Sequence, residues 1–114
     1  MLKIANDPFK VVLQAAEELW PDLKVDIQWN PTMKMNKKEY GCTIFPEDGS
    51  TPLIELNPGL KVKYAVEILG HELAHVVVGV GAGHGPEWQK AFEAIFDKYS
   101  ELMKLLADAH SVKK

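Results

Sequence analysis

Apolar residues recur at helical spacing in three stretches of the chain, and these stretches predict three helices. The first covers residues 8–20, follows Asp7 in the form of an N-cap, and ends at Pro21. The second is expected over residues 61–78, and a long third helix begins at Pro86. The second half of the 61–78 helix is apolar nearly all round, so this helix is expected in the middle of the molecule.

Shorter segments with alternating apolar and polar side chains predict three β-strands, which cover residues 24–29, 40–45 and 52–56. The last two flank residues 46–50, a segment rich in turn formers, and are expected to form an antiparallel hairpin. The order helix, three strands, two helices predicts an α+β fold. In this fold a small antiparallel three-stranded sheet packs with an N-terminal helix, a central helix and a long C-terminal helix.

The length and composition predict a single globular domain over residues 1–114, with 46% apolar and 25% charged residues. No apolar run is long enough to cross a bilayer, so no membrane association is expected. The N-terminus reaches Asp7 and Pro8 before a signal-peptide core could form, and the single Cys42 cannot make an internal disulfide. These features predict a cytoplasmic location. They do not indicate the oligomeric state.

The charged residues argue against specific recognition of nucleic acid. All 13 basic residues are lysines, and the net charge is −3. Arginine supplies the bidentate fork that is favoured for phosphates and base edges, and the chain has none. A weak, salt-sensitive contact through surface lysines stays open as an alternative to a simply solvated surface. The lysines concerned are Lys34, Lys37, Lys38, Lys61 and Lys63.

Two histidines and a glutamate interrupt the apolar central helix. His71 and His75 are four residues apart, so their side chains project from nearly the same face, one turn apart. Two imidazoles in this arrangement can occupy two corners of a zinc tetrahedron. Glu72 lies about 100° round the helix from His71, which puts its carboxylate beside a metal and not on it. The motif therefore predicts a Zn²⁺ site with Glu72 as general base.

A catalytic zinc site needs a third protein ligand and an open fourth position. His84 is the leading candidate, because it lies nine residues past His75, just beyond a glycine-rich segment that would let the chain double back. Two alternatives stay open. His84 could instead cap the final helix, or Glu87 could be the third ligand. The glycines of this segment are Gly79, Gly81, Gly83 and Gly85.

Other candidate sites are weaker. The glycine segment follows a helix and lacks the lysine and hydroxyl of a phosphate-binding loop, so it does not predict a nucleotide site. Cys42 has no histidine near it in the sequence and is interpreted as an ordinary buried thiol. Glu67, one turn before His71, is interpreted either as an outer partner of the metal site or as a surface residue.

The sequence His-Glu-Leu-Ala-His at residues 71–75, followed by His-Gly-Pro-Glu-Trp at 84–88, resembles the SprT-like zinc metallopeptidases. The bare core is similar to the minimal zincins called minigluzincins. The resemblance covers about residues 52–96 and implies a compact zincin-like core and a protein or peptide substrate. It also implies that His71, His75 and His84 bind zinc and that Glu72 is the general base.

The chain departs from the SprT-like pattern in two respects. With Cys42 alone it has no cysteine zinc ribbon, and the spacing between His75 and His84 is short beside several relatives. A role in clearing proteins crosslinked to DNA is therefore not expected.

The predicted function is a zinc-dependent peptidase, and three alternatives remain. A compact three-histidine zinc nuclease would use a similar site, but the absence of arginine counts against it. A non-catalytic, zinc-stabilised binding module would not need Glu72. A repressor-cleaving peptidase is favoured only if Glu87 or Glu93 replaces His84 at the metal.

Overall fold

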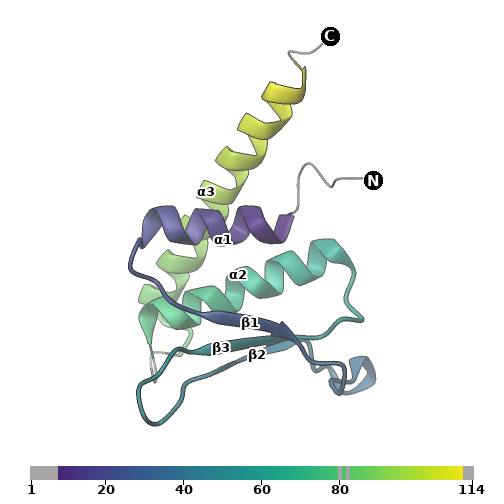
Figure 1. Ribbon diagram of the computed structural model, residues 1–114, viewed down its shortest axis with the longest axis vertical. Helices are drawn as coiled ribbons and strands as arrows, with labels where there is room; N and C mark the ends of the chain where they lie inside the picture. Colours follow the sequence, from purple (N-terminus) through teal and green to yellow (C-terminus); the bar gives the residue numbers. More distant parts are fainter. Residues whose placement is uncertain (1–7, 80, 82, 112–114) are drawn as a thin grey trace.

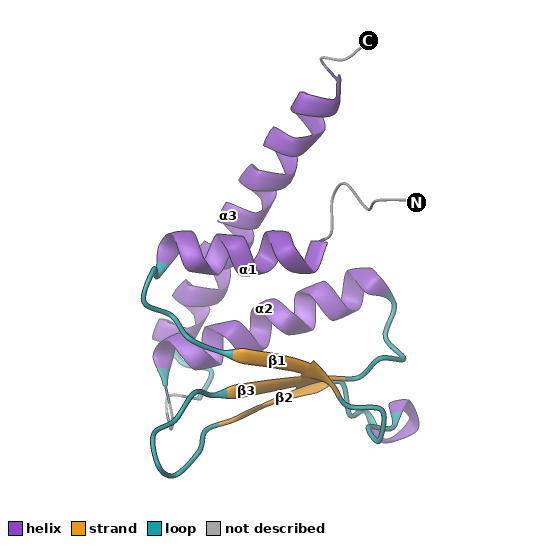
Figure 2. Cartoon of the chain, in the orientation of Figure 1, coloured by secondary structure: helices purple, strands orange, loops and turns teal. Residues whose placement is uncertain are grey.

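The structure is a computed structural model that describes residues 8–79, 81 and 83–111. In chain order, its elements are helix α1 (Pro8–Leu19), strand β1 (Asp26–Trp29), a short 3₁₀ turn (Met35–Lys37), strands β2 (Gly41–Ile44) and β3 (Leu53–Leu56), and helices α2 (Val62–Val78) and α3 (Pro86–Ser111). Figure 2 shows helices packed on a small sheet, and the predicted α+β class and element order are confirmed. The predicted N-cap, Asp7, lies outside the described residues.

The sheet has the strand order β1-β3-β2, with β3 in the centre. The predicted antiparallel hairpin of β2 and β3 is confirmed, and it pairs Thr43 with Ile54. The prediction that the whole sheet is antiparallel is wrong, because β1 runs parallel to β3 and pairs Ile27 with Ile54. The reason lies in the connections. The chain leaves β1, passes over to the far edge to form β2, and the hairpin then returns it as β3 between the two outer strands.

Helix α2 is central to the molecule, as its apolar sequence predicts. It contacts α1, α3, β2 and β3, and in Figure 1 it lies between the sheet and α1. The buried core joins residues of all three helices to the central strand β3. Its largest fully buried side chains are Val12, Ile54, Leu56, Leu69, Leu73 and Ile95.

Close approach of α2 to its neighbours depends on two residues that have no side chain. A Cβ atom on Gly70 would collide with the ring of Phe96 on α3, and a Cβ on Gly41 would lie 2.6 Å from Ile68 on α2. The first glycine therefore lets α2 and α3 pack closely, and the second lets the edge strand β2 lie against α2. Both contacts place these elements around the same part of α2.

Helix α3 is longer than the body of the molecule requires. Figure 1 shows that its C-terminal half extends past α1, away from the sheet. Residues 88–99 of this helix carry the aromatic stripe that packs on the core, including Phe92, Phe96 and Tyr99. Among the described residues, no helix combines the length and the apolar character that a membrane span requires.

Candidate metal centre

Three histidine side chains come together beside the C-terminal half of α2. The Nε2 atoms of His71 and His75 lie 3.3 Å apart, those of His75 and His84 lie 3.0 Å apart, and those of His71 and His84 lie 3.2 Å apart. His71 and His75 are half-buried, and His84 is exposed. The three Nε2 atoms thus form a nearly equilateral triangle, and each histidine contributes one corner. We call this arrangement the histidine triangle.

The triangle has the dimensions of one face of a metal tetrahedron. Zinc–nitrogen bonds of about 2.0–2.1 Å at tetrahedral angles hold two ligand nitrogens about 3.3–3.4 Å apart. The observed separations of 3.0–3.3 Å are close to this edge. These three residues could therefore hold a metal ion. A tetrahedral ion with three protein ligands keeps one position for water or substrate.

The glycine segment brings His84 to the other two histidines. Helix α2 ends at Val78, and the N–H of Gly79 closes it on the carbonyl of His75 at 2.9 Å. Gly79 has φ 87°, Gly81 has φ 84° and Gly83 has φ 62°. Residues that have a Cβ atom rarely adopt such positive φ angles, whereas glycine adopts them freely. The chain can therefore reverse here, as the alternating glycines predict.

Trp88 is a residue of the site whose role the sequence did not indicate. Its side chain is buried, with 8% of its surface exposed. Its ring centroid also lies 4.8 Å from His71, 5.6 Å from His75 and 4.8 Å from His84. Its Nε1–H donates a hydrogen bond of 3.2 Å to the carbonyl of His71, and its ring stacks on Phe92. Trp88 therefore links α3 to α2 beneath the three imidazoles. The available signal was its place four residues after His84, in the His-Gly-Pro-Glu-Trp segment.

Glu72 lies beside the histidine triangle and outside it. The residue is 7% exposed, and its Oε2 is 3.9 Å from Nε2 of His71. Its other oxygen, Oε1, accepts a hydrogen bond of 2.7 Å from the hydroxyl of Thr43 on β2. The carboxylate is thus near the triangle without taking part in it. Thr43 is the second residue that sequence reasoning missed, because its contact with Glu72 spans 29 positions of the chain.

Burial lowers the pKa of two of the three histidines. The pKa of His71 is lowered chiefly by desolvation, with a smaller contribution from the charge of His84, and Glu72 partly opposes the change. The pKa of His75 is lowered by the same main cause. Desolvation disfavours the imidazolium form. The neutral form, whose lone pair a metal ion requires, is therefore favoured for both rings.

The other candidate residues lie elsewhere. Glu87 and Glu93 are exposed on α3, and within the described part of the chain the group of possible metal ligands contains only the three histidines. Glu67 is exposed on α2. Cys42 is half-buried beside Glu55 on β3, and the pKa of its thiol is raised by burial and by that carboxylate. A raised thiol pKa agrees with its interpretation as an ordinary thiol.

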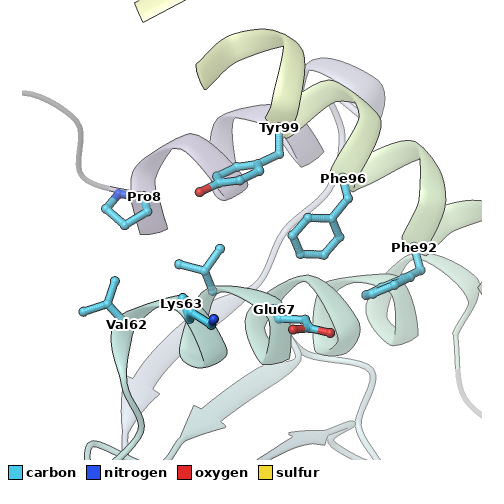
Figure 3. Close-up of a pocket in the computed structure, with 8 residues that line it drawn as sticks. Pro8, Val62, Lys63, Glu67, Phe92, Phe96 and Tyr99 are labelled. Carbon is cyan, nitrogen blue, oxygen red and sulfur yellow. The ribbon is translucent and has the colours of Figure 1, made fainter. Parts of the chain in front are cut away.

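A cavity of about 680 Å³ lies between α1, α2 and α3. In Figure 3 the rings of Phe92, Phe96 and Tyr99 project from α3 toward α2, and Val62 and Pro8 lie at the other end. Phe92 lines the cavity and also lies beside the histidine triangle, because its ring centroid is 6.4 Å from that of His71. The cavity therefore begins one aromatic ring away from the histidines.

Comparisons of this chain with protein-family models, with curated protein sequences and with solved structures find no match. The assignment of a function accordingly depends on the residues and geometry described above.

Proposed function

We propose that this chain is a zinc-dependent peptidase of the type that carries a His-Glu-x-x-His (HExxH) motif, here residues 71–75. One observation carries the proposal: three histidine nitrogens lie at the spacing of a tetrahedral face, with a buried carboxylate 3.9 Å from one of them. A structural metal site usually has four protein ligands, whereas a catalytic one has three and an adjacent base. The resemblance of residues 71–75 and 84–88 to SprT-like peptidases and minigluzincins supports peptide hydrolysis over other hydrolytic reactions.

Zinc is the metal that fits the donor set best. Three neutral imidazoles form a nitrogen-rich site, which suits zinc and does not suit calcium or magnesium, whose ligands are oxygens. When bound, zinc supplies an acidified water, with a pKa near 7, and polarises a carbonyl oxygen. His71, His75 and His84 would hold the ion, and the lowered pKa of the first two keeps them in the form that binds it.

Glu72 is the general base in this proposal. Its Oε2 is the oxygen nearer the histidines and is therefore placed to take a proton from the attacking water. The same oxygen can then give the proton to the amine that leaves when the peptide bond breaks. The position of Glu72 follows from the helix, since it is offset from both flanking histidines and does not compete with them for the ion.

Strand β2 gives the peptide a place to bind. It is an outer strand of the sheet, and Thr43 connects it directly to Glu72. An outer strand offers unpaired backbone groups, to which an extended peptide can hydrogen-bond as an additional strand. An extended peptide on β2 would lie next to the carboxylate and the three histidines.

The test compares the purified wild-type protein with Glu72→Gln and, as a matched control, Glu67→Gln at an exposed position of α2 five residues earlier. Zinc content and cleavage of an unfolded protein are measured for each. We expect about one zinc per chain in all three proteins. We also expect cleavage by the wild type and the control, and a loss of at least about a hundredfold in Glu72→Gln, the lower end of the range for general acid–base catalysis.

The outcomes separate the alternatives. A wild-type protein without stoichiometric metal would contradict the zinc site. Zinc binding without cleavage of protein would favour a non-catalytic binding module. Metal-dependent cleavage of DNA or RNA, with none of protein, would favour the three-histidine nuclease.

A further inference from the structure

The hydroxyl of Thr43 is in direct contact with the carboxylate of Glu72. Its Oγ1 lies 2.7 Å from Oε1 of Glu72 and 3.4 Å from the backbone carbonyl oxygen of the same residue. A hydroxyl has one proton to donate. The shorter contact, which goes to a charged acceptor, is the stronger of the two. The proton of Thr43 is therefore directed to Oε1.

This hydrogen bond makes the two carboxylate oxygens different. Oε1 is held by Thr43, and Oε2 is the oxygen 3.9 Å from Nε2 of His71. A glutamate side chain has three rotatable bonds, and its terminal torsion is broad. A partner on one oxygen limits this rotation and keeps the other oxygen directed toward the histidines.

Thr43 itself is held in place. It lies within β2, where it pairs with Ile54 of the central strand. Two positions before it, Gly41 lets this strand lie against Ile68 of α2. Thr43 is also β-branched, and such side chains have restricted χ1 rotamers. The sheet therefore presents the hydroxyl to Glu72 from a rigid element.

We infer that Thr43 is a positioning residue for Glu72 and that it directs Oε2 of the carboxylate toward the metal centre. This inference rests on the proposed function, because it assigns Glu72 the role of base. A positioning role differs from a purely structural one, in which Thr43 would only give the buried carboxylate a hydrogen-bond donor and any other donor would do as well. If Thr43 positions Glu72, loss of its hydroxyl slows the reaction step more than it weakens the binding of substrate.

The first test compares Thr43→Val, which keeps the shape but removes the hydroxyl, with Thr43→Ser, which keeps the hydroxyl. The zinc-loaded proteins are assayed on a peptide taken from the wild-type cleavage products. Loss of a partner that orients a metal-site group costs about 10- to 100-fold. We therefore expect Thr43→Val to lower kcat about tenfold or more with KM within twofold. Thr43→Ser should stay within threefold of wild type, and the zinc affinity should stay within threefold in both.

The second test needs no activity and uses the metal-free protein. The unfolding equilibrium is measured in urea for wild type, Thr43→Val, Glu72→Ala and the double variant. If the contact exists, Thr43→Val changes the unfolding equilibrium constant about fivefold more in the wild-type background than in the Glu72→Ala background, where the carboxylate is gone.

The outcomes distinguish this inference from the proposed function. A coupling within twofold between the two substitutions would overturn the contact. Coupling with an unchanged kcat in Thr43→Val would reduce Thr43 to a structural partner and overturn the inference while the peptidase assignment stands. A zinc-loaded wild-type protein that cleaves no peptide would overturn the proposed function and the inference together, whatever the coupling.

Discussion

His71 and His75 owe their positions to the helix repeat, because residues four apart on an α-helix lie on the same face. His84 has no such support. It is exposed and follows a segment whose glycines have positive φ angles. At the scale of single residues, the site therefore combines two preorganised side chains with a third whose position depends on the loop.

Replacing His84 tests its place in the triangle. We expect His84→Ala to weaken zinc binding by more than about 100-fold, since changes to mere outer partners of a metal site already cost 10- to 100-fold. The measurement is competition with a chromophoric chelator at pH 7. Glu87→Ala is the matched control, because Glu87 is the alternative ligand. Should the glutamate variant lose affinity and the histidine variant keep it, the third ligand would have to be reassigned.

The lowered pKa values of His71 and His75 predict how the metal-free protein responds to acid. Below the ordinary histidine value of about 6.5, the unfolded chain takes up protons at these rings before the folded chain does. Stability contributed by these groups is therefore present above pH 6.5 and is lost as the pH falls through their folded values. We expect the free energy of unfolding of the metal-free protein to decrease from pH 7 to pH 5.

Urea denaturation at several pH values measures this effect. The double variant His71→Gln, His75→Gln provides the comparison, because it lacks both titrating rings. Its free energy of unfolding should change less over the same range. An equal change in both proteins would mean that other groups cause the acid sensitivity.

At the scale of elements, the local patterns predicted each helix and strand but not how the strands are arranged. The turn formers between β2 and β3 indicate a hairpin because a tight turn is a local feature. The parallel pairing of Ile27 with Ile54 depends on a connection that passes over to the opposite edge of the sheet. No pattern within β1 distinguishes a parallel partner from an antiparallel one.

The same limit explains which residues of the site were found. The spacing of His71, Glu72 and His75 on one helix and the glycines before His84 are local signals. The contact between Thr43 and Glu72 depends on how β2 lies against α2, and the role of Trp88 depends on how α3 lies against α2. These are tertiary contacts, which periodicity and spacing do not report.

The glycine segment that joins α2 to α3 can be tested separately from the ligands. Gly79 has φ 87° and ψ 178°, a region that is nearly restricted to glycine. We expect Gly79→Ala to lower the free energy of unfolding by about 1–3 kcal/mol and to weaken zinc binding, because the loop that carries His84 is displaced. Thermal unfolding and chelator competition measure the two effects.

Gly49 provides a matched control in the turn between β2 and β3. It has φ 77°, and in both glycines an added Cβ would have no atom within 4 Å, so the cost of alanine is conformational in each case. Gly49→Ala should therefore destabilise the fold without changing zinc affinity. If both variants lose affinity equally, the effect of Gly79→Ala is a general result of destabilisation.

At the scale of the whole molecule, the three histidines bring helix α2 together with the loop that precedes α3. The unfolded chain does not hold the three imidazoles together, so an ion that binds this triangle stabilises only the folded state. A free zinc concentration 100 times Kd adds about 2.7 kcal/mol to the free energy of unfolding. We expect zinc to raise Tm and a chelator to reverse the rise.

Calorimetry with and without zinc measures this difference, and His84→Ala is the control variant. Its Tm should respond to zinc much less than that of the wild type. A Tm of the wild type that is independent of zinc would contradict a metal centre built on these histidines.

The position of Trp88 has a consequence for spectroscopy. Its indole ring lies 4.8–5.6 Å from all three imidazoles, whereas Trp29 is exposed at the end of β1 and Trp20 follows α1. Replacing Trp20 and Trp29 with Phe would leave Trp88 as the only source of tryptophan fluorescence. Paramagnetic Cu²⁺ or Co²⁺ bound by the three histidines would quench this fluorescence, because the ion would lie next to the indole ring. Trp88 would thus report the binding of an ion to the three histidines without an added dye or a substrate.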